Sequence, residues 1–182
     1  MTWLVAAVVL VVALVLWLSW TANRLDRMHH RIDVARAVLD ARLLHRSGTT
    51  MEVAGCDALD PATRLVLLDA AHGARQASPG DFEAAESALS ETLRAAFDDA
   101  EQVRALREAD REVGPLLREL ADDARKVELA RRIHNDTVVT ARALRSRRRV
   151  RWLHLAGHAA ELRAVDLDDV PPSGLVALAD GG

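Results

Sequence analysis

The chain has 182 residues, of which 50% are hydrophobic and 28% charged, and its formal net charge is −3. Alanine, leucine and arginine dominate, tyrosine is absent and phenylalanine occurs twice, so the composition favours helices and argues against a β-sheet protein. The single cysteine, Cys56, fits a reducing compartment and leaves no partner for a disulfide within the chain.

The first element is an uncharged run from Trp3 to Trp20. A helix rises about 1.5 Å per residue, so this run reaches about 27 Å, close to the roughly 30 Å hydrocarbon core of a bilayer. Trp3 lies at one end and Trp17 and Trp20 at the other, where indole rings favour the headgroup boundary. The run is longer than the apolar part of a secretory signal, and no basic side chain precedes it. We therefore predict a transmembrane anchor over residues 1–20.

Positive charge flanks only the C-terminal side of this run, where Arg24, Arg27, Arg31 and Arg36 follow one another. Lysine and arginine collect on the cytoplasmic flank of a membrane span. The charge pattern therefore predicts a single-pass protein of the inner or plasma membrane, with its N-terminus outside and its C-terminal domain in the cytoplasm. A domain tethered on the outside is the alternative that protease accessibility would separate.

Two amphipathic segments follow the anchor. Apolar side chains recur at three- and four-residue steps over about residues 21–46, which predicts a helix that continues from the anchor and ends at the Ser47–Thr50 run. A second helix is predicted from Asp60, because aspartate accepts hydrogen bonds from free amides at the N-cap and Pro61 suits the first helical position. The expected buried side of this helix consists of Leu65, Leu68 and His72, flanked by Leu67 and Ala71.

The second half of the chain predicts two further helices, with a short helix between them. One begins after Asp81 and ends near Asp98, and the longest covers about residues 116–145. Asp123 interrupts the apolar stripe of the longest helix, and the sequence offers no reason for its place there. Because each stripe must be buried against the others, we predict an all-α fold in which the anchor continues into an antiparallel, up-down four-helix bundle over residues 21–160.

The last segment, residues 161–182, is acidic and contains the turn-forming sequence Pro171-Pro172-Ser173-Gly174. Acidic segments rich in proline and glycine at a chain terminus are commonly disordered. We therefore expect a largely disordered C-terminal tail.

Two groups of residues are similar to those of a known family. Near the anchor stand Asn23-Arg24-Leu25 and Ile32-Asp33-Val34-Ala35, and far downstream stands the segment ARRIHNDTV. Together they resemble the LemA family of single-pass bacterial membrane proteins over about Thr2 to Leu144, although His134 stands where the family usually has tyrosine. The resemblance implies an outer N-terminus and a helical body, and it implies no established activity, cofactor or catalytic residue. The family-motif positions are Ala130, Arg131, His134, Asn135, Asp136 and Val138.

A basic run follows the longest predicted helix and consists of Arg145, Arg147, Arg148, Arg149, Arg151 and Trp152. In an up-down bundle the end of the fourth helix returns toward the membrane, where each basic residue gains about 1 kcal/mol from anionic lipid. The sequence therefore indicates a possible anionic-lipid contact. The alternatives are a solvated helix end, whose cations favour the helix dipole, and the less favoured binding of nucleic acid.

No phosphate-binding, dinucleotide-binding or nucleophile-elbow motif occurs in the chain. The pairs His154/His158 and His29/His30 are too sparse to indicate a metal site, and a histidine on an apolar stripe, such as His134, is more often a core residue than a ligand. We predict no cofactor, no metal and no catalytic residue, and a non-catalytic membrane-anchored interaction or scaffold protein with an unknown protein partner. The alternative is an enzyme or enzyme accessory with a site around His134–Asp136.

Overall fold

The computed structural model describes residues 1–145 and 163–180, and for residues 18, 21–26, 29, 144 and 145 it describes the backbone only. All regular secondary structure in these residues is helical, which confirms the predicted all-α class. The helices are α1 (Thr2–Gly55), α2 (Pro61–Gln76), α3 (Phe82–Phe97), α4 (Ala100–Ala109), α5 (Val113–Arg145) and α7 (Ser173–Asp180).

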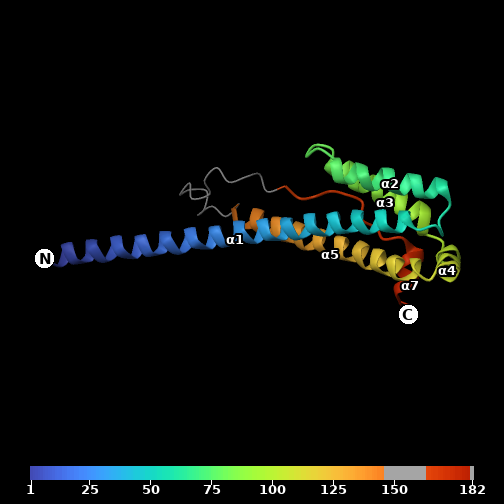
Figure 1. Ribbon diagram of the computed structural model, residues 1–182. Helices are drawn as coiled ribbons and strands as arrows, with labels where there is room; N and C mark the ends of the chain where they lie inside the picture. The colour runs from blue at the N-terminus through green and yellow to red at the C-terminus, as the bar shows by residue number, and fades with distance from the viewer. Residues whose placement is uncertain (146–162, 181–182) are drawn as a thin grey trace.

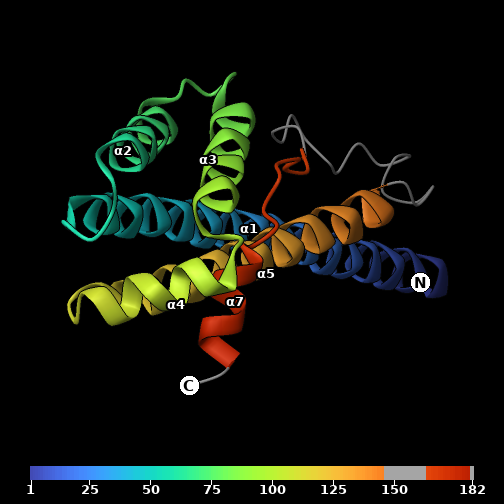
Figure 2. The same cartoon turned by 90° about the vertical axis from the view of Figure 1, so that its right-hand side faces the viewer.

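The helices form a bundle at one end of α1 (Figure 1). The C-terminal half of α1 packs along α5, which runs in the opposite direction, and α2 and α3 form a shorter hairpin against α1. Helices α4 and α7 cover the far end of the bundle, where α7 lies against both α4 and α5 (Figure 2). The predicted helical bundle is thus confirmed. It consists of the long antiparallel pair α1–α5, the shorter hairpin α2–α3 and the pair α4–α7 at one end, instead of the four-helix up-down arrangement that the sequence predicts.

Helix α1 runs through the predicted stop at Ser47–Thr50 and ends at Gly55. The hydroxyls of Ser47 and Thr50 donate to carbonyls three or four residues earlier in the same helix, over 2.9 and 2.8 Å, and the hydroxyl of Thr49 donates to Asp123 of α5. Hydroxyl side chains that bond to the preceding turn remain compatible with a helix. The predicted helix end was therefore wrong, because the polar run is buried inside the bundle and is satisfied by the helix itself and by Asp123.

The predicted start of α2 is confirmed. The side chain of Asp60 accepts hydrogen bonds from the amides of Ala62 and Thr63, each over 3.0 Å. The hydrogen bond from the Thr63 side chain, together with these amide bonds, holds the pKa of Asp60 below its ordinary value. Helix α3 begins after Asp81 as predicted, but the side chain of Asp81 does not cap it and instead accepts a hydrogen bond from the hydroxyl of Ser78 over 2.7 Å.

The predicted buried side of α2 is confirmed in part, because its centre lies at the flanking residues Leu67 and Ala71, with Leu68 partly buried beside them. Leu65 and His72 are exposed, and the buried residues are Leu67, Ala71 and Ala74. Leucine and alanine occur on several sides of this helix, so its neighbours decide which side is covered. Here α1 and α3 cover the side of Leu67 and Ala71.

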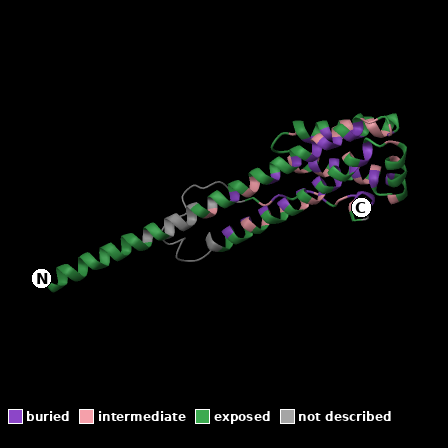
Figure 3. Cartoon of the chain, turned by 60° about the horizontal axis from the view of Figure 1, so that its bottom comes forward, coloured by how far each residue is buried: buried purple, intermediate pink, exposed green. Residues whose placement is uncertain are grey.

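The hydrophobic core is concentrated away from the N-terminus, as Figure 3 shows. The largest cluster joins residues of all six described helices, including the fully buried Leu67, Phe97 and Leu175. A smaller cluster around Leu39 and Val127 continues along the α1–α5 pair toward the N-terminus. Residues 1–17 are all exposed, and this part of the chain extends beyond the core. No helix among the described residues has both the length and the apolar character that crossing a membrane requires.

The expectation of a disordered tail is wrong for residues 163–180. Val165 and Leu167 are buried at alternate positions of an extended segment, and α7 follows with Leu175 fully buried. The acidic residues of the tail have specific partners, since Asp168 pairs with Arg94 and Asp169 pairs with Arg131. The acidic composition predicts disorder. In the structure the carboxylates pair with arginines of α3 and α5, and the neighbouring Val165 and Leu167 are buried.

Candidate functional site

The residues of the ARRIHNDTV segment bind the chain's own C-terminal segment. Arg131 makes a bidentate ion pair with Asp169, with distances of 2.5 Å from Nε to Oδ2 and 2.8 Å from Nη2 to Oδ1. The side-chain amide of Asn135 donates to the carbonyl of Val165 and accepts from its amide, each over 2.9 Å. Two-point contacts of this kind hold a segment in one register. The segment from residue 163 to 169, the C-terminal strap, is therefore fixed along α5.

His134 lies beneath the C-terminal strap and is 3% exposed. Its Nε2 is 3.4 Å from the carbonyl oxygen of Arg163, and its Nδ1 is buried without a hydrogen-bond partner. Burial lowers the pKa of His134 below its ordinary value of 6.5, and the nearby charge of Arg36 acts in the same direction. His134 is therefore a neutral core histidine at neutral pH.

We expect the bundle to lose stability as the pH falls below about 6.5, the ordinary histidine pKa. Because the pKa of His134 is lower in the folded chain than in the unfolded chain, the unfolded chain takes up the proton first, so acidification favours unfolding. The stability that depends on neutral His134 is fully present above about pH 6.5 and is lost as the pH falls below it. Urea unfolding of the full chain in detergent at pH 7.5 and 5.5 measures the loss, which should be smaller in His134→Leu. An equal loss in both proteins would contradict this account.

The other predicted motif positions have structural places. Ala130 and Val138 are buried in the α1–α5 interface, and Asp136 is exposed. Arg132 pairs with Glu128 on the same helix, so the pair with Asp136 that its spacing allows is not the one formed. The sequence places this segment in a long helix, as the structure shows, but it predicts disorder for the C-terminal strap that the segment binds.

The predicted membrane residues separate into two groups. Trp3, Trp17 and Trp20 lie on the projecting part of α1, with exposed fractions of 89%, 40% and 58%. The basic run lies outside the residues whose side chains are described, because only the backbone of Arg145 is described and residues 146–162, which include Arg147, Arg148, Arg149, Arg151 and Trp152, are not.

A buried ion pair joins α1 to α3. Arg46 is 1% exposed, and its Nη2 lies 2.7 Å from Oε2 of Glu86, which is 3% exposed. Nη1 of Arg46 donates to the hydroxyl of Ser90 over 2.9 Å, while its Nε has no hydrogen-bond partner. Sequence reasoning missed this pair because it placed Arg46 at an exposed helix end. The sequence feature that could have indicated the pair is an arginine within an otherwise apolar stripe, followed directly by the hydroxyl-rich residues 47–50.

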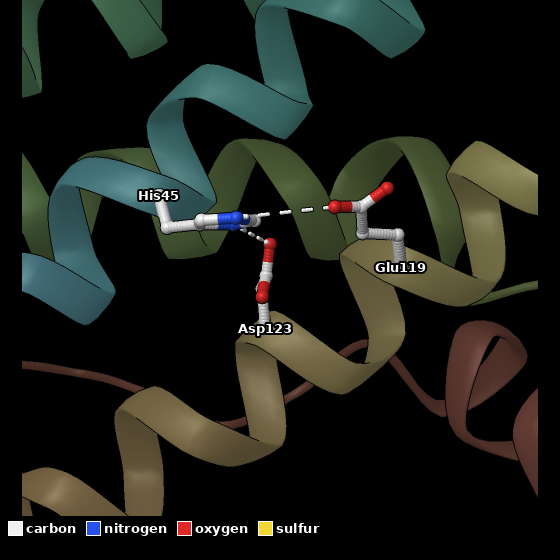
Figure 4. A group of neighbouring side chains, drawn as sticks. All are labelled: His45, Glu119 and Asp123. Atoms are coloured by element: carbon white, nitrogen blue, oxygen red, sulfur yellow. Dashed lines mark hydrogen bonds and ion pairs between the residues drawn. The ribbon is translucent and has the colours of Figure 1, made fainter.

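A second polar cluster joins α1 to α5 and explains Asp123 (Figure 4). Asp123 is 1% exposed, and its Oδ2 accepts a hydrogen bond from the hydroxyl of Thr49 over 2.8 Å and lies 2.7 Å from Nδ1 of His45. Nε2 of the same ring faces Oε1 of Glu119 over 3.9 Å. The acid that interrupts the apolar stripe therefore meets polar partners from the facing helix.

A hollow of about 350 Å³ lies between α1, the end of α2 and the start of α3. Arg36, Phe82 and Glu86 are among its lining residues. The guanidinium of Arg36 lies over the ring of Phe82, 4.8 Å from its centroid, and also pairs with Asp40, while Glu86 is held by Arg46. The charged groups of this hollow are thus engaged with one another rather than converging on one point, as an active site requires.

Comparison of the chain with models of known protein families, with curated proteins and with solved structures gave no match. The geometry of the chain itself therefore carries the functional argument.

Proposed function

We propose that this protein is a single-pass, membrane-anchored helical scaffold of the LemA type, whose bundle presents a binding surface on the cytoplasmic side. One observation carries the proposal. Between Leu4 and Leu16 of α1, the valine and leucine side chains are 50–72% exposed, and none of them enters the described core of the bundle. Burying such a side chain contributes about 1.5–3 kcal/mol, so this helix requires an apolar surrounding.

Lipid is the surrounding that fits this surface best. The run from Trp3 to Leu18 is apolar on every side of the helix, whereas a helix that lies on a membrane surface or packs on one partner keeps a polar face. Only the backbone of Leu18 is described, so the length of the proposed span is taken from the sequence of the run as far as Trp20. The arginines that follow the run support a cytoplasmic bundle.

The engagement of the motif residues supports a scaffold rather than an enzyme. Arg131 and Asn135 use their polar atoms on the C-terminal strap, and His134 is buried beneath it. The alternative of an enzymatic site around His134–Asp136 requires polar groups that face a substrate. The arrangement of these side chains therefore favours an interaction module.

Charges placed in the apolar run should release the protein from membranes. Each aspartate near the centre of a membrane-spanning helix costs about 2.5–3.5 kcal/mol, so we expect the double variant Val9→Asp, Val12→Asp to move to the soluble or aggregated fraction. Resistance to alkaline carbonate extraction of cell membranes measures the effect. Val139→Asp is the matched control, because Val139 is 59% exposed on α5, away from the run.

The wild-type protein should remain with the membrane pellet, and so should Val139→Asp. Orientation follows from Cys56, the only cysteine of the chain. A membrane-impermeant maleimide should leave Cys56 unlabelled in intact spheroplasts and should label a Thr2→Cys, Cys56→Ala variant. Carbonate extraction of the wild type, or retention of the double aspartate variant, would refute the anchor, and labelling of Cys56 from outside would refute the orientation.

A further inference from the structure

A group of three metal-ligating side chains lies between α1 and α5, apart from the residues that hold the strap. His45, Glu119 and Asp123 each offer one ligand atom, and these atoms all lie within 4.8 Å of one another. Among the residues whose side chains the structure describes, this is the one such grouping of three histidine, cysteine or acidic side chains. Figure 4 shows the histidine reaching from α1 to two carboxylates one turn apart on α5.

The spacing of two of these atoms suits a single ion. Nε2 of His45 and Oε1 of Glu119 are 3.9 Å apart. Atoms that bind one tetrahedral zinc ion at about 2.0–2.2 Å lie about 3.4 Å from each other, so an ion fits once these two half-exposed side chains approach by about 0.5 Å. Half of each side chain is exposed, with fractions of 52% and 49%, which leaves room for water at the remaining coordination positions.

Asp123 orients the histidine for this role. Its Oδ2 lies 2.7 Å from Nδ1 of His45, and a ring that donates Nδ1–H to this carboxylate carries its free lone pair on Nε2, the atom that faces Glu119. Metal-binding histidines almost always donate their second nitrogen to a carboxylate, carbonyl or water in this way. Thr49 donates to the same oxygen of Asp123 and fixes its position.

The burial of Asp123 fixes its carboxylate behind the His45 ring, with Thr49 and Lys126 as its other partners. An ionised carboxylate is costly to bury unless charged partners or hydrogen bonds compensate it. Asp123 is 1% exposed on the core stripe of α5, and the Nζ of Lys126 is 3.8 Å from its other oxygen. A divalent cation on the far side of the His45 ring adds positive charge to the same hydrogen-bonded chain.

We propose that His45 and Glu119 bind one divalent transition-metal ion of the Zn²⁺ class, with Asp123 as the positioning residue. An imidazole nitrogen with a carboxylate favours Zn²⁺, Co²⁺ or Ni²⁺ over Mg²⁺ and Ca²⁺, which prefer oxygen ligands. Water completes the coordination, so the ion exchanges with solvent. Because its two protein ligands come from α1 and α5, the ion ties the two long helices together and stabilises the bundle.

The test is titration of the tag-free full chain in detergent with Co²⁺, followed by its visible absorption, and with Zn²⁺, followed by calorimetry. We expect one ion per chain, binding at least tenfold weaker in Glu119→Gln, no binding in His45→Gln, and wild-type binding in the control His72→Gln, whose histidine is exposed on α2. The partly exposed positions of His45 and Glu119 allow these variants to fold, and circular dichroism checks this. The rise in melting temperature caused by Zn²⁺ should be equal in the wild type and His72→Gln, smaller in Glu119→Gln and absent in His45→Gln.

Asp123→Asn tests the positioning role, since loss of such an outer partner weakens metal affinity by about 10–100-fold. The Co²⁺ absorption band should also shift in this variant, which a loss of packing alone would not cause. The proposal is overturned if the wild type binds neither ion at millimolar concentration, or if Glu119→Gln and His45→Gln bind as tightly as His72→Gln.

Discussion

Glu86→Ala should destabilise the bundle by about 3–5 kcal/mol, the range measured when one partner of a buried ion pair is removed. The substitution leaves the guanidinium of Arg46 buried, with Ser90 and the backbone carbonyl of residue 86 as its remaining partners. Nε of Arg46 already has no hydrogen-bond partner, so the substitution adds a second unsatisfied group to a guanidinium that is already incompletely bonded. Urea unfolding of the full chain in detergent, followed by circular dichroism, measures the change.

Asp40→Ala is the matched control for this prediction. It breaks the pair between Arg36 and Asp40, which joins the same kinds of charge one turn apart but is 40% and 49% exposed. Exposed pairs at this spacing contribute about 0.3–0.5 kcal/mol, so the control should stay within about 0.5 kcal/mol of the wild type. A Glu86→Ala loss as small as that of Asp40→Ala would show that Arg46 reaches solvent when its partner is removed.

A double substitution separates stability from specificity at this site. Arg46→Met together with Glu86→Leu replaces both charges by apolar side chains of similar size. Such replacements are often neutral or stabilising, by up to about 4 kcal/mol, because the cost of desolvating both charges disappears. We expect the double variant to recover most of the stability that Glu86→Ala loses, which would identify the unpaired charge, rather than lost packing, as the cause.

Gly174→Ala should destabilise the chain by about 3 kcal/mol, at the upper end of the cost of overpacking a core. A Cβ atom at this position would lie 2.4 Å from the carbonyl oxygen of Phe97 and 3.0 Å from the backbone of Asp99. Both contacts are with backbone rather than with a flexible side chain, so α7 must move away from the junction of α3 and α4. Leu175, fully buried beside it, would be withdrawn from the core.

The same substitution in α2 should have the opposite sign. Gly73 lies inside the helix, and a Cβ there would meet nothing within 4 Å. Alanine is favoured over glycine in a helix interior by about 0.5–1 kcal/mol, so Gly73→Ala should stabilise the chain by that amount. Unfolding by urea compares the two variants directly. Equal effects of Gly73→Ala and Gly174→Ala would contradict the close packing of α7.

The proposed metal site and the buried ion pair lie on consecutive residues of α1 and face different helices. His45 meets α5, and Arg46 meets α3. Neighbouring positions on a helix differ by about 100° in direction, so one turn of α1 connects to both sides of the bundle. Because metal binding at His45 tightens only the α1–α5 contact, Zn²⁺ should leave the loss caused by Glu86→Ala almost unchanged.

The sequence by itself determined the all-α class, the start of α2 at Asp60, the short helix before α5 and the long apolar run at the N-terminus. These features depend on local chemistry, because caps, helix propensity and apolar periodicity act over one or two turns. The long helix that carries the ARRIHNDTV segment was also predictable, although the partner of that segment was not.

Only the tertiary structure decided the continuation of α1 through Ser47–Thr50, the buried side of α2 and the order of the C-terminal segment. Each depends on a partner distant in the chain: Glu86 lies 40 residues from Arg46, Asp123 lies 78 from His45, and Asp169 lies 38 from Arg131. From the sequence alone, a polar or acidic side chain is predicted to face solvent, because the partner that allows its burial is distant in the chain. The physical reason is that burial of a charge is unfavourable alone and tolerable once it is paired, and pairing across helices is a property of the fold.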